Sequence, residues 1–207
     1  MTVRLIAHTS NADYIAGQAA SICTGATDWA KARKHAMESG HDSVAEHVSF
    51  TFRIEGVSRA LLAQITRHRI ASFSVKSQRY VEMNEMPYVV PPTIRKDPAV
   101  FAKYQHLMSH INDFYNLAVA SGIPKEDARF ITPQAACTDL IVTMNARELR
   151  HFFSLRCCNR AQWEIRQLAD EMLALCKEKA PMLFADAGPG CVRGKCPEKR
   201  PCGSPKK

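Results

Sequence analysis

Apolar residues in the first quarter of the chain follow two different spacings. Residues 3–8 read as a short strand, and residues 48–54 alternate between apolar and polar side chains, which predicts a half-buried strand. Residues 13–23 carry small apolar side chains at helical spacing. Residues 28–39 predict a second helix that ends at a glycine, and residues 41–47 form a polar turn after it.

The middle of the chain has a mainly helical pattern. Val57, Leu61, Leu62 and Ile65 suit one face of a helix, whereas the stretch up to Pro92 is broken by prolines. A long helix is predicted over residues 98–121 and a short one over residues 125–130. The apolar side of the long helix would carry Phe101, Tyr104, Leu107, Met108, Ile111, Phe114 and Leu117.

The last third combines a strand with two helices. Residues 140–144 predict a buried strand, and Asn145 with Glu148 forms a capping-box pattern in which Asn145 caps the helix and Glu148 reaches back. Residues 159–162 repeat that logic before a helix that ends at Pro181. The whole pattern predicts an α/β (α+β) fold, with mixed helices around a central sheet. A single catalytic domain is expected over residues 1–187, followed by a Cys/Lys/Pro-rich tail over residues 188–207.

Composition is that of an ordinary globular protein. The chain has 207 residues, of which 46% are hydrophobic and 23% charged, so one domain with a sizeable core is expected. No apolar run reaches the roughly 18 residues of a membrane helix. The N-terminus lacks the layout of a signal peptide. We therefore expect a cytoplasmic protein with no membrane partner.

The net charge of +8 raises the question of nucleic acid binding. Residues 188–207 hold six basic side chains against one carboxylate, so five of the eight net charges belong to the tail. The remaining basic residues look like local anion sites, and no nucleic acid partner is expected. A basic RNA- or DNA-binding module, using the segment from Arg67 to Tyr80 and the tail, is the competing interpretation.

Two segments concentrate groups that bind anions. Residues 67–80 hold three arginines, one histidine and three serines among apolar residues. Guanidinium groups match phosphate oxygens with paired donors, and serine adds short hydroxyl donors. The second segment surrounds the helix after Asn145 and carries Arg147, Arg150, His151, Arg156 and Arg160.

Both segments resemble one family. Arg67-His68-Arg69, then seven residues, then Ser77 and Gln78-Arg79-Tyr80 is similar to the signature of the flavin-dependent thymidylate synthases. The run from Asn145 to Arg156, and the block from Asn159 to Ile165, resemble the same family. The resemblance spans roughly residues 19–187 in blocks and is weak around residues 81–125.

The resemblance implies a fold, a reaction and a set of site residues. Members of the family are mixed α/β domains that assemble as homotetramers with active sites at subunit interfaces. They methylate dUMP to dTMP with FAD as cofactor, NADPH as electron source and methylenetetrahydrofolate as carbon donor. By resemblance, FAD would contact Ser43, Glu46, Arg67, His68, Arg69, Asn145, Arg147 and His151. The dUMP site would be lined by Gln64, Ser77, Gln78, Arg79, Arg129 and Arg156.

The chemistry explains why such residues are needed. Methylation at C5 of uracil requires stabilisation of the negative charge at the N3/O4 edge, and Arg156, following the family pattern, is the expected catalytic residue. Ser77 and Arg79 would hold the substrate phosphate. Side chains cannot supply hydride, whereas a reduced flavin can. No GxGxxG motif is present, so side chains and an interface must hold FAD. Position 75 is Val where several members carry Glu or Gln, so we expect one polar contact to the substrate to be absent or made by a backbone group.

Eight cysteines leave other chemistry open. A disulfide framework is not expected, and Cys23, Cys137 and Cys176 suit the core. Cys157 or Cys158 as a nucleophile is a minor alternative, and the family pattern does not require one. His41 and His47 do not match a metal motif. The tail offers three cysteines where a zinc site wants four, so a fourth ligand would have to come from elsewhere, and we expect no metal. A structural zinc protein organised by the tail is a third interpretation.

Overall fold

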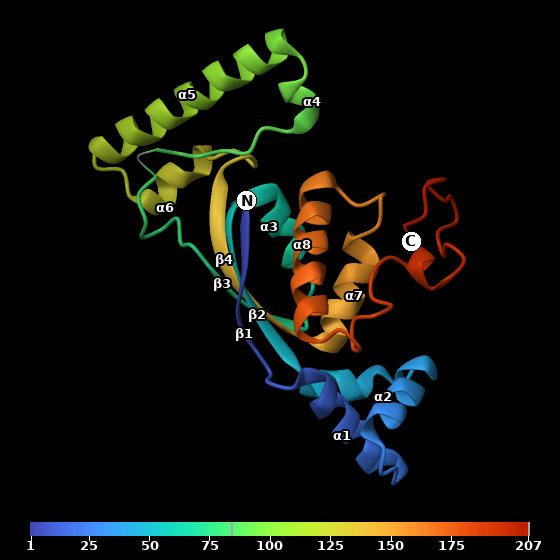
Figure 1. Cartoon of the computed structure of the whole chain (residues 1–207). Helices are drawn as coiled ribbons and strands as arrows, with labels where there is room; N and C mark the ends of the chain where they lie inside the picture. Colours follow the sequence, from blue (N-terminus) through green and yellow to red (C-terminus); the bar gives the residue numbers. More distant parts are fainter. Residues whose placement is uncertain (84, 207) are drawn as a thin grey trace.

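A four-stranded antiparallel sheet lies at the centre of the computed structural model, which describes residues 1–83 and 85–206. Lys207, the last residue of the predicted tail, and Asn84, in the proline-broken stretch, lie outside the described residues. The strands are β1 (Thr2–His8), β2 (Ser49–Ser58), β3 (Ala71–Val75) and β4 (Cys137–Asn145), in the order β1-β2-β4-β3 (Figure 1). The α+β fold and the strands at all three predicted positions are confirmed, while β3 was not anticipated.

Strand β2 shows how the alternating pattern becomes one buried face. Phe50, Phe52 and Ile54 are fully buried, whereas the intervening Thr51 and Arg53 are not. The strand runs past the predicted end because its pairing with β4 shifts register around Gly56, whose φ is 69°. A residue inserted in this way bends the strand and lets it continue.

The extension of β2 corrects the helix predicted to start near Val57. Val57 belongs to β2, and α3 (Arg59–Ile65) begins only after Ser58. The Ser58 hydroxyl accepts a hydrogen bond from Leu61 N at 3.0 Å, which caps the helix. Leu61 and Ile65 are buried as predicted.

Two helices cover the buried face of the sheet. α7 (Ala146–Arg156) and α8 (Trp163–Lys179) share one core cluster with β2 and β4 (Figure 1). Phe152, Phe153 and Met172 are fully buried there. Side chains of this size each contribute about 1.5–3 kcal/mol when taken out of water.

A helical hairpin lies at one end of the sheet, formed by α1 (Ala12–Thr24) and α2 (Trp29–Glu38) (Figure 1). Asp28 caps α2 by accepting from the backbone N–H groups of Ala30 and Lys31, each at 3.1 Å. The predicted polar turn after α2 is a short 3-10 helix, η1 (Asp42–His47). Cys23, expected in the core, is exposed on α1, so that prediction was wrong.

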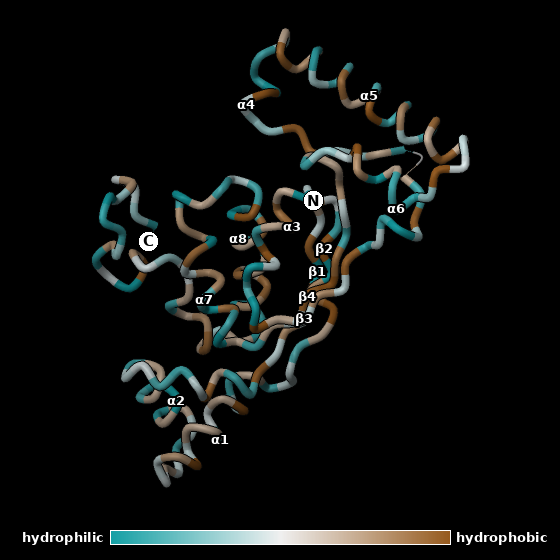
Figure 2. Tube along the Cα trace, turned by 180° about the vertical axis from the view of Figure 1, so that it is seen from behind, coloured by the Kyte–Doolittle hydropathy of each residue, from teal (hydrophilic) through white to brown (hydrophobic). Residues whose placement is uncertain are grey.

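Helix α5 (Pro98–Ala120) stands apart from the sheet, between α4 (Pro92–Arg95) and α6 (Lys125–Ala128) with the 3-10 turn η2 (Arg129–Ile131) (Figures 1 and 2). Its predicted apolar side is only partly covered. Met108 is buried, but Leu107, Phe114 and Leu117 are 57%, 53% and 64% exposed in the single chain.

The tail does not extend the sheet or the core. Ala187 is the last residue of the main core cluster, and a single 3-10 turn, η3 (Gly190–Arg193), follows it. None of the helices in the described part of the chain is long and apolar enough to cross a membrane.

Candidate functional site

The junction between β4 and α7 carries the first group of polar side chains. Asn145 ends the strand, and its Oδ1 accepts a hydrogen bond from Glu148 N at 2.8 Å, so the predicted N-cap is confirmed. The second half of the predicted capping box is not formed. The Glu148 carboxylate turns instead to His68 and accepts from Nδ1 at 2.8 Å.

His68 connects the two arginine-rich segments. Its ring is 4% exposed, and Arg156 donates from Nε to its Nε2 at 3.2 Å. Because Nε2 must offer a lone pair to that donor, the proton of the neutral ring lies on Nδ1, where Glu148 accepts it. Burial lowers the pKa of His68, the charges of Arg156 and His151 add to the effect, and Glu148 opposes it. The ring is therefore a neutral link between the base of α7 and its C-terminal arginine.

Arg156 is held by hydrogen bonds to two neighbours. In addition to His68, its Nη2 donates to the carbonyl of Gln64 at 3.4 Å. Burial lowers the pKa of Arg156, and the nearby charge of Arg67 acts in the same direction. The guanidinium is thus partly desolvated and oriented, which is the state in which it stabilises a developing anion best.

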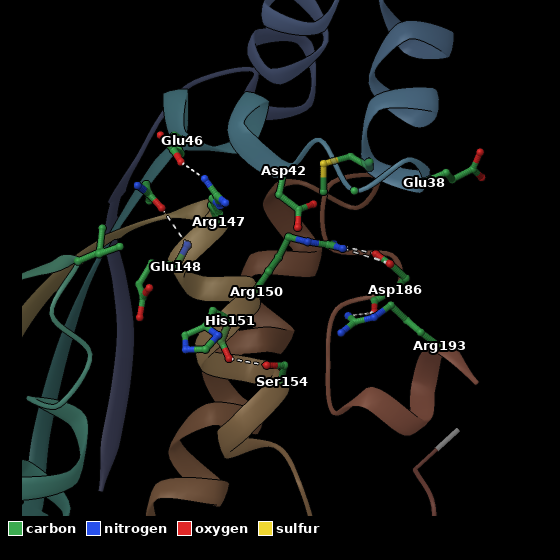
Figure 3. Close-up of a pocket in the computed structure, with 14 residues that line it drawn as sticks. Glu38, Asp42, Glu46, Arg147, Glu148, Arg150, His151, Ser154, Asp186 and Arg193 are labelled. Atoms are coloured by element: carbon green, nitrogen blue, oxygen red, sulfur yellow. Dashed lines mark hydrogen bonds and ion pairs between the residues drawn. The ribbon is translucent and has the colours of Figure 1, made fainter. Parts of the chain in front are cut away.

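A large cavity opens beside this junction, with a volume of about 840 Å³ (Figure 3). Four of the eight residues predicted to contact FAD line it: Glu46, Asn145, Arg147 and His151. Glu46 and Arg147 form a close ion pair, which raises the pKa of Arg147. Sequence reasoning missed the acidic residues on the wall, Glu38, Asp42 and Asp186, which come from segments without a motif.

Arg150 fixes the far wall of this cavity. It donates to Asp186 from Nη1 and Nη2 at 2.7 and 3.1 Å (Figure 3). It also donates to the carbonyl of Leu183 at 2.7 Å. The pairing with Arg150 holds the pKa of Asp186 below its usual value. Arg150 is therefore committed to the protein, whereas His151, on the same helix, is exposed to the cavity.

The other predicted FAD residues lie around rather than in the cavity. His68 sits behind Glu148, which lines the wall. Ser43 is exposed on η1, and Arg67 and Arg69 are exposed before β3. Of the eight residues predicted to contact FAD, four therefore line the cavity. A fifth, His68, is hydrogen-bonded to the wall residue Glu148.

A second cavity of about 470 Å³ lies between α3 and the segment after β3. Ser77, Gln78 and Arg129, three of the six predicted substrate residues, line it. Arg59, at the start of α3, adds a further cation that sequence reasoning missed, because it stands alone outside both arginine-rich segments. Two guanidinium groups, an amide and a hydroxyl suit a phosphate-bearing ligand.

The remaining substrate residues point elsewhere in a single chain. Arg79 pairs with Glu126, Nε to Oε2, at 2.9 Å. Gln64 and Arg156 meet on the His68 side of α3 and do not line the second cavity. Helix α3 therefore separates the predicted substrate residues into two groups.

Metal and nucleophile chemistry fit this region poorly. Among the residues the structure describes, the donor atoms of His68, Glu148 and His151 lie within 4.8 Å of one another. Both ring nitrogens of His68 are already bonded, and the Arg156 guanidinium would repel a cation. Cys157 is fully buried, and burial raises the pKa of its thiol far above the usual value, so no thiolate is available there.

Comparison with known proteins gives consistent matches. The model of the family described as thymidylate synthase complementing protein matches residues 4–182. A flavin-dependent thymidylate synthase of Geobacter sulfurreducens is 48% identical over 212 residues, covering 96% of this chain and 91% of the relative. Those of Nitratidesulfovibrio vulgaris and Pyrococcus abyssi are 53% and 47% identical, covering 78% and 77% of this chain and 70% and 69% of the relatives.

Proposed function

The chain belongs to the family of flavin-dependent thymidylate synthases, enzymes of thymidylate biosynthesis, and we propose that it methylates dUMP to dTMP with FAD as its flavin. Methylenetetrahydrofolate supplies the carbon and NADPH the electrons. The net reaction converts dUMP, methylenetetrahydrofolate, NADPH and a proton into dTMP, tetrahydrofolate and NADP⁺. The observation that carries the proposal is the bond between His68 and Arg156, because it joins both arginine-rich segments of the family signature in one place.

The large cavity is the proposed FAD site. Its volume lies within the range of cofactor pockets, and its wall offers both a cation and an imidazole, in Arg147 and His151. These groups would bind the pyrophosphate, while Asn145 and Glu46 offer an amide and a carboxylate for neutral polar groups. Arg67 and Arg69, with Ser43 and the buried His68, complete the proposed set. The flavin, when bound, supplies the hydride that no side chain can provide.

The second cavity is the proposed site of the dUMP phosphate. Ser77 and Arg129 would bind the phosphate oxygens, with Gln78 beside them. Arg79 would join them after release from Glu126. Gln64 lies at the other end of α3 from Arg59, next to Arg156. Residue 75 is Val, so the contact made there by an acidic or amide side chain in several family members is either absent or made by a backbone group.

Arg156 is the proposed catalytic residue. Its guanidinium would lie at the N3/O4 edge of uracil, where negative charge accumulates as C5 becomes nucleophilic. His68 holds that guanidinium through Nε, which leaves an Nη group free to face the ring. His68 thus orients the Arg156 guanidinium, which keeps its positive charge.

In a single chain, helix α3 separates the proposed substrate residues into two groups. We propose a homotetramer in which neighbouring subunits share a site and so bring the two groups together. Leu107, Phe114 and Ile141 are exposed in the single chain, on α5 and on the open face of the sheet. Exposed apolar surface of this kind supports burial between subunits. A cytoplasmic location stays a prediction.

The visible spectrum of the purified protein tests the proposal. We expect a yellow protein whose flavin absorption bleaches on anaerobic addition of NADPH. With dUMP and methylenetetrahydrofolate present, dTMP should then accumulate. A protein that stays colourless after incubation with FAD, yet binds nucleic acid in a salt-dependent manner, would favour the competing interpretation instead.

A further inference from the structure

Four cysteines line one small cavity that the proposed reaction does not use. It lies between the α7–α8 connection and the tail and has a volume of about 210 Å³. Cys191, Cys196 and Cys202 come from the tail, and Cys158 comes from the residues just after α7. The fourth ligand that the tail sequence lacked is therefore supplied by the same chain.

The tail is fastened over this cavity by specific contacts. Asn159 Nδ2 donates to the carbonyl of Ser204 at 2.7 Å, and Lys206 pairs with Asp170 of α8 at 2.7 Å. The tail also folds closely on itself, since a Cβ on Gly190 would lie 2.7 Å from the ring of Pro197. These contacts hold the segment against α8 and the α7–α8 connection, although most of its residues from Arg193 to Pro205 are exposed.

Hydrophobic burial cannot explain that order. Apart from its cysteines and prolines, the segment from residue 188 to the end contains one large apolar residue, Val192. A segment of such composition buries too little apolar surface to offset the conformational entropy that it loses on folding. In small segments of this kind, a bound metal ion commonly stabilises the folded state.

The adjacent cysteines of the α7–α8 connection have separate places. Cys157 is fully buried in the main core, whereas Cys158 is only partly buried and lines the cavity. The connection thus directs one thiol into the core and presents the other to the tail.

We propose that Cys158, Cys191, Cys196 and Cys202 bind one zinc ion as a structural site. Zinc prefers four thiolates in a tetrahedral arrangement when its role is structural. Such a centre carries a net negative charge, and the cavity is lined by two basic side chains, Lys206 and Arg160, against one carboxylate, Glu198.

Binding would draw the four thiols together. No three of these sulfur atoms lie within 4.8 Å of one another, whereas zinc bonds of about 2.3 Å place ligand sulfurs closer than that. Gly194 and Gly203, with φ of 136° and 76°, flank Cys196 and Cys202 and give the backbone room to close. The site would then anchor the end of α7, where Arg156 lies.

The metal content of the untagged, full-length protein tests the proposal. Elemental analysis after purification without chelators should find about one zinc per chain, in wild type and in Cys23→Ser, whose thiol is exposed on α1. Cys158→Ser and Cys196→Ser should lose most of that zinc. Iron must be counted together with acid-labile sulfide, because flavin colour would mask a cluster.

Titration of wild type with a mercurial keeps the test independent of variants that misfold. Zinc should be released as the mercurial modifies the four proposed ligand thiols. The proposal is overturned by any of three results: no zinc after reduction and exposure to zinc, iron with stoichiometric sulfide, or zinc retained in both variants. An intact mass that shows tail disulfides in freshly purified protein would equally overturn it.

Discussion

Arg156 donates a hydrogen bond from Nε to Nε2 of His68, at 3.2 Å, across 88 positions of sequence. His68 in turn donates from Nδ1 to Glu148, on the same helix as Arg156. The imidazole therefore bridges the two ends of α7. A protonated ring would have no lone pair for Arg156, so the arrangement depends on a neutral His68.

The stability of the fold should therefore decrease as the pH falls below the ordinary histidine value of 6.5. Burial lowers the folded pKa of His68, so the unfolded chain takes up a proton that the folded chain excludes. The contribution is present above that value and is lost as the pH falls towards the folded pKa. Urea unfolding between about pH 8 and pH 5 should show a flatter pH dependence in His68→Gln than in wild type. Identical slopes would show that His68 is not the group responsible.

Arg156→Lys should reduce kcat by about a hundredfold to a thousandfold, because an ammonium cannot both bond to His68 and face the substrate with paired donors. Flavin content and thermal unfolding should stay close to wild type. Arg4→Lys, in an exposed ion pair with Glu55 on the sheet, is the matched control and should leave turnover unchanged. A lysine variant with full activity would exclude Arg156 as the catalytic residue.

Glu164→Ala should destabilise the protein by about 2–4 kcal/mol, because it leaves buried donors of Ser58 without an acceptor. The carboxylate accepts from Ser58 N at 2.8 Å and from the Ser58 hydroxyl, and both residues are buried. Denaturant unfolding measures the loss. Glu178→Ala, exposed at the other end of α8, should change stability by less than about 0.5 kcal/mol. Equal effects would mean that the buried bonds contribute little.

Gly17→Ala should destabilise the hairpin of α1 and α2 by about 1–3 kcal/mol, although alanine is the better helix former. A Cβ at this position would lie 2.5 Å from Cε3 of Trp29 and 2.9 Å from its carbonyl oxygen. Since α2 also supplies Met37 and Glu38 to the large cavity, the flavin content should fall as well. Gln18→Ala is the control on the same helix. A gain in stability for Gly17→Ala would show that the two helices separate easily.

Hydrophobic periodicity predicted the elements in which buried residues recur at the regular spacing of a strand or of a helix. The alternation over Phe50, Phe52 and Ile54 marked β2, and the repeat of apolar residues marked α5. The pattern failed at Val57, because the register shift near Gly56 keeps the chain in the sheet. It also missed β3, whose alternate serines are exposed while its apolar positions are only half-buried.

The chemistry of the site was predictable only in part. The arginine-rich segments predicted anion-binding residues, of which Arg147 and Ser77 line the two cavities, and the cap at Asn145 was readable from local sequence. Nothing local could indicate that Glu148 faces His68 instead of its own helix start, because that contact depends on how β3 and β4 pair. The same holds for Cys158, whose neighbours in space lie more than thirty positions later in the chain.

The strand order of the sheet has a consequence for how the protein is made. β2 and β3 both lie beside β4, so β2 can pair with β1 early, whereas β3 has no partner strand in the sheet until residues 137–145 have left the ribosome. A nascent chain that ends before β4 also lacks Asn145, Arg147 and His151 of the large cavity. With the flavin in the large cavity, as proposed, its capture would be a late event of synthesis, and fragments from interrupted translation would not compete with finished enzyme for the cofactor.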